Sequence, residues 1–137
     1  MELEPTKIKP PGWDGSGSLN PSLLSFDINS LVATMKQSKT WIEGNLNSMI
    51  LFRSPGKQIV LSALHEDTEV ILNNEVDSVT IHVIEGRIQF QTHDETLILQ
   101  KNQLLTLHEK MKYCMTTLET TVLLLTIVSS ITPRLEN

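Results

Sequence analysis

The stretch Ser78–Phe90, with the sequence SVTIHVIEGRIQF, decides the fold. Its first eight residues alternate so that Val79, Ile81 and Val83 share one face, as they would in a β-strand. The opposite face is also partly apolar, which is expected if one face lines a barrel and the other meets a second layer. The turn signal Glu85-Gly86 follows, and a second alternating segment begins after it. The stretch therefore predicts two β-strands joined by a tight turn.

Most of the chain on either side of this stretch has the same character. Short segments rich in Ile, Val, Leu and Thr are separated by turn signals such as Ser54-Pro55-Gly56. No second helical period intervenes, which argues against a parallel βαβ architecture. Short strands at this spacing indicate an all-β closed barrel or jelly-roll sandwich. The predicted strands are residues 48–53, 58–64, 69–72, 78–85, 87–92, 96–99, 103–107, 112–116 and 121–129.

Residues 1–26 differ from the rest of the chain. They hold four of the six prolines and three of the six glycines, so we expect an irregular N-terminal arm without regular structure. Trp13 lies inside this arm. Its indole either packs against a surface, on its own barrel or on a partner subunit, or is incidental to a disordered tail.

The sequence predicts one helix after the arm. Asp27 is a suitable cap, and apolar residues follow at the spacing i, i+3, i+4 and i+7. This pattern predicts a short helix over residues 28–37 that packs one stripe against a sheet. We therefore divide the chain into the arm, a barrel domain with its leading helix over residues 27–132, and a C-terminal tail at 133–137.

Composition excludes several classes of protein. The chain has 137 residues, 11 basic and 16 acidic, and a net charge of −5, which argues against nucleic-acid binding. One cysteine cannot form an internal disulfide and suits a reducing compartment. No apolar run reaches the roughly 20 residues that span a bilayer, and no secretory signal is visible at the start. We expect one cytoplasmic domain that binds neither membrane nor nucleic acid.

Two segments resemble the barrel motifs of the cupins. The first is Val79–Phe90 with its Glu-Gly turn, and the second is Leu99–His108 followed by Tyr113. Together with the closing strand Thr121–Ile127, the resemblance to small bacterial single-domain cupins covers about residues 27–129. It implies an all-β double-stranded β-helix, the cupin jelly-roll barrel, preceded by the irregular arm and the short helix. It also implies a homodimer.

The usual metal ligands of that family are not matched. The resemblance places them at Val79, near Leu72–Glu75 and at Tyr113, and these positions carry an aliphatic side chain, two amides and a phenol instead. Transition metals favour imidazole and carboxylate. The four histidines are scattered, at positions 65, 82, 93 and 108. We expect no metal, no cofactor and no catalytic residue. Cys114 should face away from the interior as a buried, inert thiol.

The barrel interior is the candidate binding site. Alternation and the resemblance direct one set of side chains into it, with an amide at its mouth. The interior either holds a small organic ligand or is filled by its own side chains. The predicted ligand-binding residues are Asn73, Val79, Ile81, Val83, Phe90, Tyr113 and Met115.

Three functions stay open. The first is a metal-free module that binds or senses a small molecule. The second is a cupin-type enzyme acting on a small molecule, similar to a dioxygenase or an isomerase. The third is a dimeric structural or interaction protein with Trp13 and Trp41 as interface anchors, since Trp is enriched at hot spots. In a dimer, a partner sheet would cover the outer face at Thr80, His82 and Ile84. The predicted helix at 28–37 is the alternative cover for this face.

Overall fold

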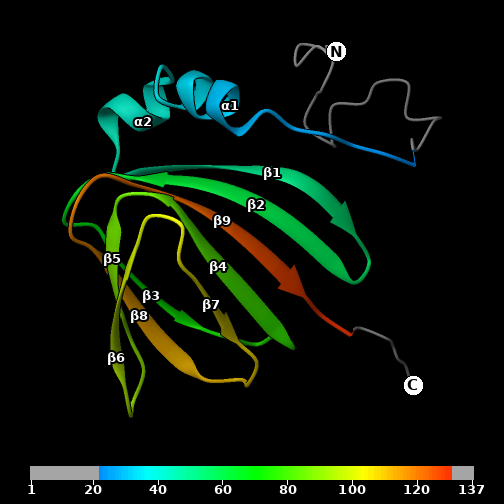
Figure 1. Ribbon diagram of the computed structural model, residues 1–137, viewed down its shortest axis with the longest axis vertical. Helices are drawn as coiled ribbons and strands as arrows, with labels where there is room; N and C mark the ends of the chain where they lie inside the picture. The colour runs from blue at the N-terminus through cyan, green and yellow to red at the C-terminus, as the bar shows by residue number, and fades with distance from the viewer. Residues whose placement is uncertain (1–21, 131–137) are drawn as a thin grey trace.

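The computed structural model describes residues 22–130, which fold into two antiparallel sheets packed face to face (Figure 1). The first sheet has five strands in the order β1-β2-β9-β4-β7, and the second has four in the order β3-β8-β5-β6. The strands are β1 Leu46–Ser54, β2 Lys57–Leu64, β3 Glu69–Asn73, β4 Ser78–Glu85, β5 Arg87–Gln91, β6 Thr96–Gln100, β7 Leu104–Leu107, β8 Lys112–Thr117 and β9 Thr121–Val128.

The turn between β4 and β5 carries the chain from one sheet to the other. β4 pairs with β7 and β9, whereas β5 pairs with β6 and β8. Gly86 adopts a φ of +95°, and a Cβ at this position would collide with the Thr121 side chain and the Thr120 carbonyl. Only glycine combines this backbone conformation with so close a contact. The Glu-Gly turn of the sequence is therefore the corner of the jelly roll.

Two helices precede the strands. α1 is Ile28–Met35, and the Asp27 carboxylate caps it by accepting from the Ser30 backbone N–H at 3.2 Å. It ends two residues earlier than predicted. α2, Lys39–Glu43, was not predicted, because five residues are too few to show a helical period.

The helices cover the outer face of the five-stranded sheet. A cluster of buried side chains lies between them and the sheet, and Ile84 of β4 packs at its margin. This confirms that the predicted helix packs one stripe on a sheet, and it shows that the helices supply part of the cover that a partner sheet would otherwise give. The buried members are Met35, Trp41, Leu51, Leu61, Ala63 and Val122.

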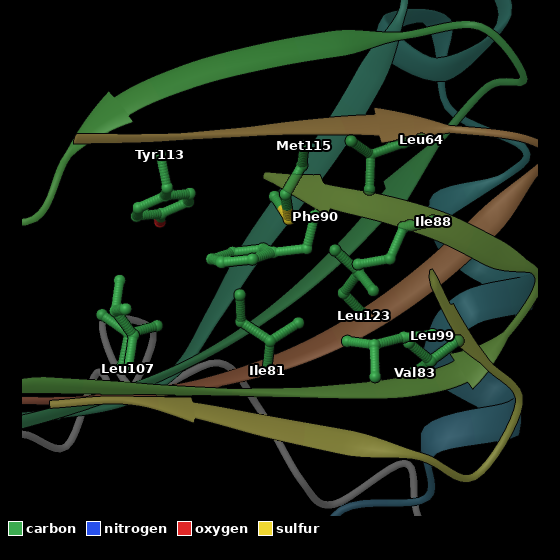
Figure 2. Close-up of a cluster of buried hydrophobic side chains, with 11 residues drawn as sticks. Leu64, Ile81, Val83, Ile88, Phe90, Leu99, Leu107, Tyr113, Met115 and Leu123 are labelled. Atoms are coloured by element: carbon green, nitrogen blue, oxygen red, sulfur yellow. The ribbon is translucent and has the colours of Figure 1, made fainter. Parts of the chain in front are cut away.

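A second cluster fills the space between the two sheets (Figure 2). Side chains reach it from both sheets because every second residue of a strand points inward. Val79, Ile81 and Val83 of β4 all lie in it, as their alternation predicts. Its buried members are Leu64, Val79, Ile81, Val83, Ile88, Phe90, Leu99, Leu107, Tyr113, Met115 and Leu123.

Candidate functional site

The two ends of the barrel interior are built differently. At the end near the helices, Val83, Ile88 and Leu123 have no solvent-exposed surface (Figure 2). Leu99 of β6 is also buried there, at 8% exposure. At the opposite end, Leu97 of the same strand is 41% exposed although it points to the same side of the sheet. The interior is therefore filled with side chains at one end and open at the other.

A hollow of about 300 Å³ lies at the open end. Its floor is apolar and its rim polar, the combination typical of sites for small organic molecules. The floor residues are Phe90, Leu97, Leu105, Leu107 and Met111, and the rim residues are Thr92, Asp94, Glu95, Thr106, His108 and Glu109.

The register of the strands explains why the floor side chains point into the hollow. Leu97 pairs with Phe90 across β5 and β6, so both point inward. Leu105 and Leu107 of β7 pair with inward residues of β4 in the same way. The floor therefore forms where β6 of one sheet faces β7 of the other.

Apart from Thr106 of β7, the rim comes from two turns. In the turn between β5 and β6, the Thr92 N–H donates to the Glu95 carbonyl at 2.8 Å, and the Glu95 N–H donates to the Thr92 hydroxyl at 3.2 Å. After β7, the buried Asn74 amide donates to the Glu109 carbonyl at 2.8 Å. These bonds fix the backbone on both sides of the hollow while the carboxylates stay at the surface.

The rim is negatively charged. Its side chains include the carboxylates of Asp94, Glu95 and Glu109, and no Lys or Arg occurs among the described residues that line the hollow. Asp94 pairs with His93 at 2.9 Å, and both side chains of this pair are highly exposed. Exposed pairs of this kind contribute little to stability.

Six of the seven predicted ligand-binding residues lie in the interior, but only Phe90 is among the described residues that line the hollow. The other five pack within the core, so their role in binding stays a prediction. Asn73 was placed wrongly. It pairs with Lys112 and is exposed on the outer face of β3, because Leu72 and Val70 take the inward positions opposite Tyr113 and Met115. The buried amide near the mouth is Asn74.

Tyr113 lies beside the floor of the hollow. Its ring stacks on Phe90 with centroids 5.0 Å apart and is 5% exposed. Burial raises the pKa of the phenol above its ordinary value of 10.0. Within residues 22–130 its hydroxyl has no hydrogen-bond partner. The residue as a whole is buried, but its hydroxyl is not among the fully buried atoms that lack a partner in the described residues.

The residues at the expected metal positions do not fit a metal ion. Val79 and Tyr113 point into the core, where they offer an aliphatic chain and a neutral phenol. Residues 22–130 contain no group of three or more His, Cys, Asp or Glu side chains arranged to hold a metal.

The histidines lie apart from one another. His82 is on the outer face, as its alternation predicts, and His93 and His108 are exposed outside the strands. His65 stacks on Trp41 with centroids 3.6 Å apart, and its Nε2 donates to the Trp41 carbonyl at 2.8 Å.

Cys114 faces outward, as predicted, but it is partly exposed and not buried. Its thiol donates to a Glu69 carboxylate oxygen at 3.3 Å. Desolvation and the neighbouring Glu69 raise the pKa of the thiol, which keeps it protonated and a weak nucleophile at neutral pH.

The acidic rim was missed by sequence reasoning. In the sequence, Asp94 and Glu95 lie beside one turn signal and Glu109 beside another. Each is indeed next to a turn, but the fold brings the two turns to the same end of the barrel. No local spacing signals this, because the juxtaposition depends on how two sheets meet.

Within the part of the chain that the structure describes, no helix is long and apolar enough to cross a membrane. No protein-family model matches the sequence, and no curated protein matches it.

Solved structures match the fold at low sequence identity. A cupin-superfamily protein from Desulfitobacterium hafniense is 16% identical, with a TM-score of 0.60 over 64% of this chain and 81% of its own. A conserved protein of unknown function from Streptococcus pyogenes is 13% identical, with a TM-score of 0.62 over 83% and 93%. A cupin-2 domain protein from Shewanella frigidimarina is 14% identical, with a TM-score of 0.59 over 80% and 94%. Together with the two antiparallel sheets and the short leading helices, these likenesses show that the chain has the cupin fold.

Proposed function

We propose that this cupin-fold protein binds a small organic molecule in the hollow at the open end of its barrel, as a metal-free binding or sensing module. One observation carries the proposal: the interior is filled at one end and open at the other. Apolar floor residues can bury the body of a ligand, and the polar rim can orient it. A volume of about 300 Å³ suits a small metabolite.

The test is a thermal-shift screen of a metabolite library with a pair of matched variants. Leu97→Trp places an indole in the hollow from the inner face of β6. Ile98→Trp places the same indole on the outer face of the same strand, where Ile98 is 48% exposed. A ligand that binds only the folded state raises Tm in proportion to its occupancy.

We expect at least one compound to raise the Tm of the wild type and of Ile98→Trp, and to leave Leu97→Trp unshifted. If no library compound shifts the wild type, the proposal fails. It also fails if the active compounds shift Leu97→Trp as much as the wild type, because they would then bind elsewhere.

A homodimer stays a prediction from the resemblance. Of the two tryptophans suggested as interface anchors, Trp41 is 8% exposed and packs in the helical cluster, so it is not available to a partner. Trp13 lies outside the described residues. On the outer face of β4, the helices reach Ile84, whereas His82 and Thr80 lie farther along the strand and pair with β7. Light scattering of the full chain tests the dimer directly.

A further inference from the structure

We infer that the molecule bound in the hollow is an organic cation, such as a protonated amine carried on an apolar body. This deepens the proposed function and rests on it. The first argument is the charge of the rim, where three carboxylates stand with no described Lys or Arg among the lining residues. These carboxylates would repel an anion placed there, whereas they would attract a cation.

Two of the three carboxylates are free to meet a ligand. Asp94 already pairs with His93. Within residues 22–130, the Glu95 and Glu109 carboxylates form no ion pair or hydrogen bond, although backbone bonds hold both residues in place. One comes from the turn between β5 and β6 and the other from the segment after β7. A cation entering the hollow would therefore find negative charge on two walls, which concentrates the field in the space between them.

The floor supplies a second, independent argument. Phe90 lies at its base, and an aromatic ring attracts a cation through its negative face. Behind Phe90 lies Tyr113, 95% buried, whose hydroxyl has no partner within the described residues. Figure 2 shows the Tyr113 ring beside Phe90 and opposite Leu107, with its oxygen directed into the interior. Tyr113 is not among the described residues that line the hollow, so the floor attracts a cation through Phe90.

Three probes of similar shape and different charge test the inference: benzylamine as its cation, benzyl alcohol and benzoate. We expect benzylamine to bind most tightly by calorimetry and to raise Tm, with an affinity that falls as salt is added. Glu95→Gln and Glu109→Gln should each weaken benzylamine binding by about two- to fivefold, as exposed ion pairs do. Glu66→Gln, an exposed carboxylate outside the hollow, is the matched control and should leave the affinity unchanged.

The outcomes separate this inference from the proposed function. If benzyl alcohol or benzoate binds as well as benzylamine, or if Glu66→Gln weakens binding as much as the rim variants do, the cation inference is overturned. If none of the three probes binds, it is overturned as well. The proposed function then stands or falls on the metabolite screen and the Leu97→Trp variant alone, because that test places no condition on ligand charge.

Discussion

The filled and open ends of the barrel are made by the same sheets and differ in what faces each strand. In β6, Leu99 is buried and Leu97, two residues away on the same face, is 41% exposed. Leu99 lies near the corner formed by Gly86, where strands of both sheets contribute side chains. Leu97 instead faces β7, which is only four residues long. The filled end therefore buries one side chain of β6, whereas the open end leaves another side chain on the same face of that strand in contact with solvent.

The largest effect should come from emptying the filled end. Ile88 is fully buried, and Ile88→Ala removes three carbon atoms from a close-packed site, which should cost about 3–5 kcal/mol of unfolding free energy. Leu97→Ala at the open end should cost less than about 1.5 kcal/mol, because its side chain is already partly in water. Denaturant unfolding measures both variants. Equal costs would mean that the two ends do not differ in packing.

The turn at Gly86, at the filled end, should be nearly as sensitive to substitution. Gly86→Ala forces a Cβ into the Thr121 side chain at a positive φ. We expect a loss of about 2–4 kcal/mol, from backbone strain and overpacking together. Gly56→Ala, where a Cβ would lie 3.2 Å from the Ser129 carbonyl and no positive φ is needed, is the milder control. A fully stable Gly86→Ala protein would show that the corner tolerates another backbone conformation.

Tyr113→Phe should have the smallest effect at neutral pH, within about 1 kcal/mol, because the hydroxyl has no partner within the described residues. Its effect should appear in alkali. The folded-state pKa is raised above 10.0, so the phenol's contribution to stability is complete below that pH and is lost as pH rises through the folded value. The wild type should therefore lose more stability in alkali than Tyr113→Phe does.

Tyr113 is the only tyrosine of the chain, so tyrosinate absorbance in the near ultraviolet reports its ionisation alone. Ionisation at or below pH 10.0 in the folded protein would show that the ring is solvated and would contradict its place beside the floor.

The strands could be predicted because each carries its own local pattern. Ser78–Glu85 has the predicted bounds, and Lys112–Thr117 differs from its predicted bounds by one residue. Asn73 was placed at the mouth of the barrel by the resemblance, and the alternation of β3 turns it outward. The rim could not be predicted, because Glu95 and Glu109 come from separate turns that only the packing of the sheets brings together.

The most direct test of a binding site at the open end is chemical-shift mapping of isotope-labelled full-length protein titrated with benzylamine. A molecule bound in the hollow should give the largest perturbations at Phe90, Leu97 and Leu107 and small ones at Val83 and Ile88. Perturbations centred on the filled end or on the outer face of β3 and β8, or none at saturating benzylamine, would contradict this expectation.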